Sequence, residues 1–205
     1  MHQKNFQAAI AAFDKANTED PNIVSTDGGE QPKELCYSQR MSDMQERYAP
    51  EASEAVKLAV RAQHIQRWKI PRTDYPMDRH GYLQWRTRLY KFHAEIASGI
   101  MKKVGYGDEI ITRVMAMLSK KGLKVNAEAQ LLEDIVGLVF IEHYLVGFAA
   151  HHPEYHDNKL VRIIRKTWQK MSPRAHAFAL AGKVILPKGM ASLILMAIEG
   201  KDVKE

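Results

Sequence analysis

The spacing of apolar residues constrains the fold most, because it repeats at helical intervals along most of the chain and no segment alternates like a strand. The pattern predicts an all-α protein of roughly seven to nine helices. We expect residues 17–32, which are polar and rich in turn formers, to form a surface loop, and residues 186–205 to form a C-terminal helix and tail. The other predicted helices span residues 1–17, 50–68, 78–104, 108–122, 126–150, 157–170 and a segment that starts at the Ser172-Pro173 pair.

The length of 205 residues predicts a single helical domain that spans residues 1–205. One cysteine, Cys36, excludes a disulfide framework. No run of about 18–20 apolar residues could cross a bilayer, so no membrane partner is expected. The N-terminal segment has no cleavage-site pattern, and we expect a cytoplasmic protein. The sequence leaves the oligomeric state undetermined.

Positive charge is concentrated in one block of the chain. The net charge is +6, and residues 61–91 alone hold eight basic and two acidic residues. Such an excess favours an anionic partner, unless it is only a solvated basic face. Arginines alternate there with aromatic residues, and guanidinium groups bind phosphate oxygens in pairs. A small anionic ligand or nucleotide is the first partner predicted and RNA the second; the arginines concerned are Arg67, Arg72, Arg79 and Arg86.

Three ionisable residues occupy positions where the helical pattern expects apolar side chains. His64 and His93 each lie on an apolar stripe, and so does Asp134, with Glu133 beside it. Imidazole and carboxylate together suit a divalent transition metal. The alternative for each histidine is a hydrogen-bonded core residue, and for Asp134 a buried salt bridge to an arginine of the basic block.

Several long runs resemble a family found in bacteria and fungi, the domain-of-unknown-function family 4202. These runs are RAQHIQRWKIPRTDYPMDRHGYLQWR, FHAEIA, LLEDIVGLVFIEHY and KTWQKMSP, and the resemblance covers about residues 5–185. The family name implies no activity.

A second, remoter resemblance is to the HD-type metal-dependent phosphohydrolases. It is carried by His64, the run HAEIASGIMKKVGYGDEIITRVMAML, Lys120-Lys121 and LLEDIVGL. That superfamily is all-α and holds a divalent metal with histidine and aspartate ligands. In one register Gln63 and His64 replace the defining His-Asp pair, and in the other His93 and Ala94 replace it. The pair is not intact in either register.

The resemblance implies a divergent HD-like phosphohydrolase that acts on a nucleotide or another small phosphate ester. A divalent metal would be held by His64, His93 and Asp134. The predicted catalytic residues are His64, His93, Glu133 and Asp134, with His64 or His93 as general base if no metal binds. The predicted phosphate-binding residues are Gln63, Arg67, Arg72, Arg79, Arg86, Lys120 and Lys121.

Two other functional classes stay open at this point. The chain could be a helical module that binds a nucleotide or RNA without turnover, which the missing His-Asp pair favours. It could also be a structural protein in which the polar residues form buried ion pairs.

Overall fold

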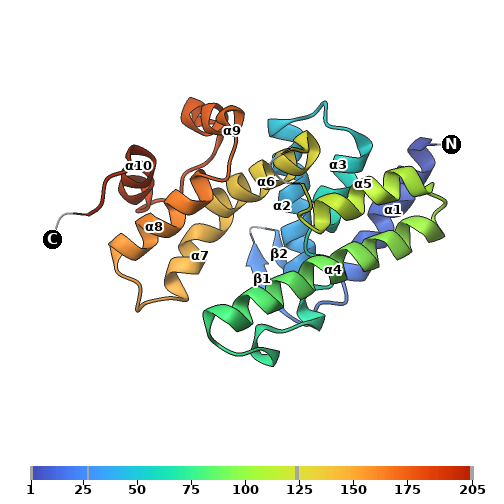
Figure 1. Cartoon of the computed structure of the whole chain (residues 1–205), viewed down its shortest axis with the longest axis horizontal. Helices are drawn as coiled ribbons and strands as arrows, with labels where there is room; N and C mark the ends of the chain where they lie inside the picture. Colours follow the sequence, from blue (N-terminus) through green and yellow to red (C-terminus); the bar gives the residue numbers. More distant parts are fainter. Residues whose placement is uncertain (1, 27, 123–124, 204–205) are drawn as a thin grey trace. The chain divides into compact units, whose positions relative to one another are not determined.

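The computed structural model describes residues 2–26, 28–122 and 125–203 (Figure 1). Contacts within the chain divide it into two compact units, residues 1–132 and 133–205. The single domain that the length suggests stays a prediction. The described residues form ten α-helical segments and one short hairpin, so the predicted all-α class is confirmed. Each unit is described by itself below.

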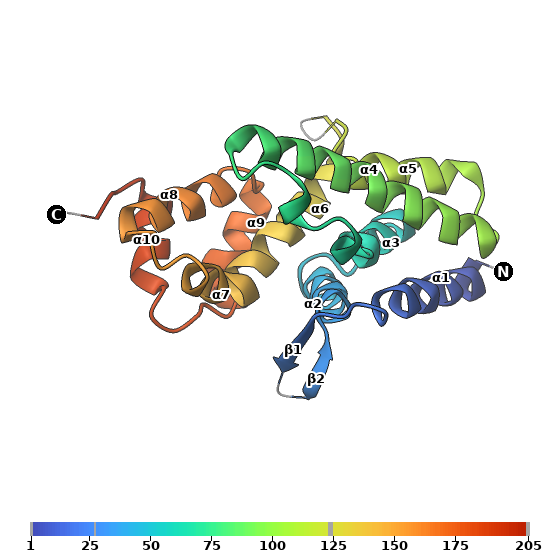
Figure 2. The same ribbon diagram turned by 90° about the horizontal axis from the view of Figure 1, so that it is seen from below.

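The first unit is built from helices α1 to α5. α4 is the longest and packs along α5, while α3 packs against both α2 and α5. Figure 2 shows α4 and α5 lying side by side in this unit. The Asp78 side chain caps α4 and the Ser53 hydroxyl caps α3, as the sequence predicts for Asp78. The bounds are His2–Asn17 (α1), Lys33–Tyr48 (α2), Glu54–Ala62 (α3), Arg79–Lys103 (α4) and Asp108–Leu118 (α5).

α6 (Ala127–Val139) crosses the boundary between the units, and most of the second unit follows it. A π-helical turn, Phe140–Tyr144, links α6 to α7 (Leu145–Ala150). α8 (Asp157–Trp168) packs against α10 (Ala191–Glu199). α9 (Pro173–Phe178) begins at the predicted Ser172 cap and runs into a second π-helical turn, Ala179–Lys183. The first π-helical turn divides the helix predicted at 126–150, and α2 lies where no separate helix was predicted. Together these two differences give the ten segments.

The prediction of a plain surface loop at 17–32 is wrong in two respects. Strands β1 (Ile23–Thr26) and β2 (Gly29–Pro32) pair antiparallel there, with Ile23 opposite Pro32. Asn17 and Asp20 are buried: Asn17 donates to the Glu34 carbonyl and accepts from the Gln66 N–H, and Asp20 accepts from the Glu34 N–H. The sequence concealed both facts because the strands have only four residues each and the buried side chains are polar.

The helix predicted at 50–68 is also shorter than expected. α3 ends at Ala62, and the chain continues through a turn into a short 3₁₀ helix, Arg67–Lys69. The backbone of Gln66 lies in the left-handed region, with φ 51°. A residue other than glycine adopts this conformation at a cost of about 1 kcal/mol. Tertiary contacts therefore override the apolar periodicity at this point.

None of the helices in the described residues is both long and apolar enough to cross a membrane.

Gly81 is a position where the first unit tolerates no side chain. A Cβ atom there would lie 2.1 Å from the carbonyl oxygen of Pro76, whereas one at Gly99 on the same helix would meet nothing within 4 Å. We expect Gly81→Ala to lower the free energy of unfolding by about 1–3 kcal/mol, because the backbone must move. Gly99→Ala is the matched control and is expected to raise it by about 0.5–1 kcal/mol. Chemical denaturation checks both, and equal effects of the two substitutions would contradict this packing.

Candidate functional site

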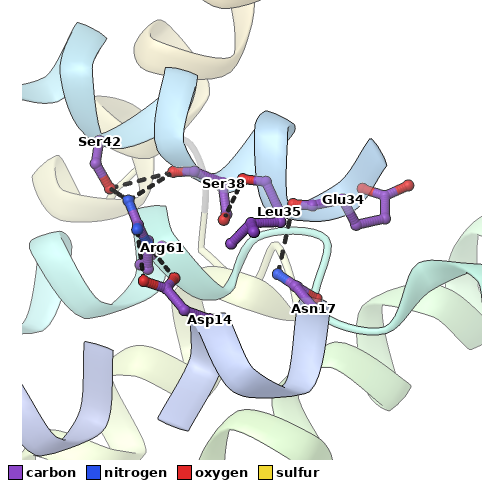
Figure 3. A network of polar contacts seen from close by, with 7 residues as sticks. All are labelled: Asp14, Asn17, Glu34, Leu35, Ser38, Ser42 and Arg61. Atoms are coloured by element: carbon purple, nitrogen blue, oxygen red, sulfur yellow. Dashed lines mark hydrogen bonds and ion pairs between the residues drawn. The ribbon is translucent and has the colours of Figure 1, made fainter. Parts of the chain in front are cut away.

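The turn that follows α3 carries His64, and one side chain from α1 holds it in place. Asn17 accepts a hydrogen bond through Oδ1 from the backbone N–H of Gln66, at 3.0 Å. Its Nδ2 group donates to the backbone oxygen of Glu34 at 3.5 Å, as Figure 3 shows. The left-handed turn and the start of α2 are thereby tied to the end of α1.

A half-buried polar network ties the same three helices further along (Figure 3). Arg61 donates two hydrogen bonds to the Asp14 carboxylate, at 2.7 and 2.8 Å. Its third nitrogen lies 3.1 Å from the Ser42 hydroxyl and 3.5 Å from the Ser38 carbonyl oxygen. This arginine of the basic block is therefore structural, since its guanidinium joins α1, α2 and α3.

His64 lies between an acidic and a basic group. Its Nδ1 atom is 3.5 Å from the Glu34 carboxylate, and its Nε2 atom is 3.2 Å from an Arg67 nitrogen. A guanidinium can only donate, so Nε2 accepts and the neutral ring carries its proton on Nδ1, facing Glu34. The ring also stacks on Tyr37 with centroids 4.0 Å apart.

His93 is held in the same tautomer by the backbone. Its Nδ1 atom donates to the carbonyl oxygen of Ile65 at 2.9 Å, which leaves a lone pair on Nε2 of the neutral ring. Nε2 is buried without a partner in the described part of the chain, and the same holds for Oε1 of Gln63. His93 is 2% exposed and Gln63 is 6% exposed. The predicted inward position of His93 is thus confirmed, and the imidazole rings of His64 and His93 lie 5.9 Å apart.

Burial and positive charge keep both histidines neutral. Burial is the main cause that lowers the pKa of His93 to about 3, and the neighbouring His64 adds to it. Burial also holds the pKa of His64 well below its usual value, and the charges of four cations lower it further. These cations are Arg67, Arg86, Lys120 and Lys33.

Glu34 is affected in the opposite direction. Burial raises its pKa to about 7, while the charges of Arg67 and Lys33 oppose that rise. Both the neutral and the ionised forms of the Glu34 carboxyl group are therefore populated near neutral pH. A buried acid of this kind can give or take a proton at working pH.

Two arginines at the site are fixed by aromatic side chains. The Arg67 guanidinium lies 4.7 Å from the ring centre of Trp85, whose indole N–H donates to the Ile70 carbonyl. Arg86 donates to the hydroxyl groups of Tyr82 and Tyr90. Burial acts to lower the pKa of Arg86, but the two tyrosines raise it overall, so the charge persists.

The other predicted phosphate-binding residues are placed differently. Arg72 donates to the carbonyl oxygens of Tyr75, Pro76 and Asp78 and so shapes the loop before α4. Arg79 and Lys121 are exposed, and none of the described contacts links either residue to His64. Of the predicted phosphate-binding residues, Arg67 contacts His64, Gln63 precedes it in the chain, and the charges of Arg86 and Lys120 act on its imidazole. Arg72, Arg79 and Lys121 do not belong to this group.

Asp134 is buried, as predicted, and belongs to the second unit. Its two oxygens accept hydrogen bonds from the backbone N–H and the hydroxyl of Ser172, at 2.7 and 2.6 Å. Ser172 in turn caps α9 through Ala175. These bonds supply the donors that a buried carboxylate requires. The neighbouring Glu133 is half-buried.

The predicted metal ligands have other partners in this arrangement. In residues 2–26, 28–122 and 125–203, no group of three or more His, Cys, Asp or Glu side chains could hold a metal ion. His64 Nε2 faces the Arg67 guanidinium, three further cations act on the same imidazole, and Asp134 accepts hydrogen bonds from Ser172. As placed, these residues do not fit a divalent metal.

Comparison with protein families gives a match over residues 7–194 to a domain of unknown function, DUF4202. The chain belongs to the DUF4202 family. Neither the curated proteins nor the solved structures yield a match. The family predicted from the sequence runs is confirmed, whereas the likeness of this DUF4202 protein to the HD-type phosphohydrolases stays a prediction.

Sequence reasoning missed three residues of this site: Asn17, Glu34 and Tyr37. The signal for two of them was present, because Glu34, Tyr37 and Met41 follow one another at helical spacing on the buried face of α2. Asn17 carried no such signal, since a polar residue before a run of turn formers usually marks a loop.

Glu34→Gln tests the raised pKa through stability. The neutral acid resembles the amide, so both proteins should have similar pH dependence below pH 4.5. Between about pH 4.5 and 7 the unfolded chain ionises Glu34 while burial keeps it protonated in the folded protein. The wild type alone therefore loses stability with rising pH, on the order of 3 kcal/mol in total relative to the variant. Urea unfolding between pH 4.5 and 8.5 measures the difference. The exposed Glu30→Gln serves as control, and a difference that does not grow with pH would contradict the assignment.

Asp134→Asn tests the hydrogen bonds of the second unit. An amide can accept only through its oxygen, so one of the two Ser172 donors loses its acceptor. We expect the free energy of unfolding to fall by about 1–3 kcal/mol, measured by chemical denaturation. The exposed Asp157→Asn on α8 should change it by less than about 0.5 kcal/mol. An unchanged stability in Asp134→Asn would show that Ser172 does not depend on the carboxylate.

Proposed function

We propose that the first unit binds the phosphate group of a nucleotide or another small phosphate ester and hydrolyses the ester. The observation that carries the proposal is the contact of Arg67 with Nε2 of a neutral His64, which also lies beside the titrating Glu34 and within the influence of three further cations. The charges of four cations act on the His64 imidazole, and Glu34 lies beside it with a carboxylate oxygen 3.5 Å from Nδ1. Such an excess of positive charge favours an anion.

Arg67 and Arg86 supply the phosphate contacts in this proposal. A guanidinium matches phosphate oxygens with two parallel N–H donors, and Trp85 behind Arg67 limits its movement. Arg86 is fixed by its two tyrosine hydroxyls. Because both guanidinium groups are already ordered, little side-chain entropy is lost on binding.

His64 acts as the general base. In the resting state its pKa is too low for that role, because burial and the four cations oppose protonation. A bound phosphate offsets those charges and draws Arg67 toward its own oxygens, so the basicity of Nε2 rises only when substrate is present. Glu34 faces Nδ1–H and stabilises the imidazolium.

The proposed reaction is a single displacement. A water oxygen bonds to phosphorus while the P–O bond to the leaving group breaks. The water proton passes to Nε2 of His64 and then to the leaving oxygen, which gives an alcohol and inorganic phosphate. The metal-assisted form that the HD resemblance implies needs ligands that the described residues do not group.

A second candidate function is binding without turnover, to a nucleotide or RNA. The specific observation in its favour is the pKa of His93, which burial lowers to about 3, far below that of a useful base at neutral pH. A ligand that is bound tightly and never consumed would support this candidate.

Two substitutions separate binding from chemistry. Arg67→Gln removes the guanidinium that faces the phosphate and is expected to weaken binding of phosphate esters by about 10- to 100-fold. His64→Gln is expected to keep binding and to stop release of inorganic phosphate. Arg162→Gln, on the exposed face of α8, is the matched control and should change neither.

The measurements are thermal shift with a panel of nucleotides and sugar phosphates, followed by phosphate release from each ligand that stabilises the protein. If no phosphate ester raises the melting temperature, the proposal fails. If hydrolysis continues unchanged in both Arg67→Gln and His64→Gln, the residue roles are wrong. Stabilisation without hydrolysis in the wild type would favour the binding module.

A further inference from the structure

Two buried acceptors at the site have no donor. Oε1 of Gln63 and Nε2 of His93 make no hydrogen bond in the described part of the chain, although both atoms are inaccessible to solvent. They belong to one region, because His93 bonds the carbonyl of Ile65, two residues after Gln63. Neither atom can satisfy the other, since both are acceptors.

An unpartnered buried acceptor is costly, so such atoms are expected to receive a donor from outside the chain. A cationic donor such as an ammonium group is disfavoured here, because Arg67, Arg86, Lys120 and Lys33 all act on the adjacent His64 ring. A phosphate dianion brings acceptors alone and leaves both atoms unpaired. The donor that fits both conditions is a neutral hydroxyl group.

We propose that the ligand of this site is a phosphate ester of a polyhydroxylated compound, such as a sugar phosphate, whose hydroxyl groups donate to Gln63 Oε1 and His93 Nε2. The inference rests on the function proposed above and narrows its substrate class. The phosphate occupies the arginines, and the hydroxylated carbon chain reaches the two buried acceptors. The selectivity comes from atoms that stay unpaired when a ligand without hydroxyl groups is bound.

The test compares two esters with the same number of carbon atoms by isothermal titration calorimetry of the whole chain. Ribose 5-phosphate carries hydroxyl groups and n-pentyl phosphate carries none, and inorganic phosphate is the third probe. We expect ribose 5-phosphate to bind about tenfold or more tightly than n-pentyl phosphate, since each unpaired buried acceptor weakens binding severalfold.

Two variants locate the selectivity. His93→Asn keeps a side-chain N–H that can donate to the Ile65 carbonyl and lacks the second ring nitrogen, while Gln63→Met removes the amide at similar size. Each is expected to reduce the ratio of the two affinities severalfold, because the other acceptor remains in place. Gln84→Met, on the exposed face of α4, is the matched control and should preserve the ratio.

The outcomes distinguish this inference from the proposed function. Equal affinity of the wild type for the two esters overturns the inference alone and means that only an internal water pairs with the acceptors. A preference that is undiminished in both His93→Asn and Gln63→Met also overturns it. If none of the three probes binds, the proposed function fails together with it. The wild-type ratio is decisive even where a variant does not fold.

Discussion

The carboxamide of Asn17 is the interaction on which the candidate site depends. It bonds the backbone of Gln66 on one side and that of Glu34 on the other, and it is completely buried. The left-handed turn at Gln66 costs free energy, and the Asn17 bond offsets part of that cost. His64 lies on this turn and faces Glu34, so their distance is set by one residue at the end of α1. The Arg61–Asp14 pair and the Arg61 bond to Ser42 join the same three helices about one to two turns away.

Electrostatics then decide the state of the groups that these contacts bring together. Two imidazole rings lie 5.9 Å apart among cations, and burial keeps both of them neutral. Glu34 is the group that titrates near neutral pH. In the unliganded site the positive charge is therefore on the arginine and lysine side chains, while the imidazoles of His64 and His93 are neutral and each keeps a lone pair on Nε2. That division suits a site whose basicity depends on the arrival of an anion.

The second unit uses its polar residues for structure. Asp134 bonds Ser172, which caps α9, and Met171 packs directly against Gly137 of α6. Trp168 stacks on His176, and the His176 ring bonds the Trp168 carbonyl. The run KTWQKMSP, which helped to identify the family, therefore forms the tightly packed junction of α8 and α9. A sequence run of this kind can mark packing as strongly as chemistry.

The sequence alone determined the all-α class, most helix ends and the family. Helix ends depend on local chemistry, as at Asp78, Asn126 and Ser172, and each of these capping residues lies at the start of a helix predicted from the sequence. Burial of His93 and Asp134 followed from periodicity. The partners of these residues did not, because periodicity places a side chain on a face and says nothing of what meets it. Only the tertiary structure showed that Glu34 faces His64, that Ser172 bonds Asp134 and that Asn17 bonds the turn at Gln66. Each of these contacts joins segments that are distant along the chain.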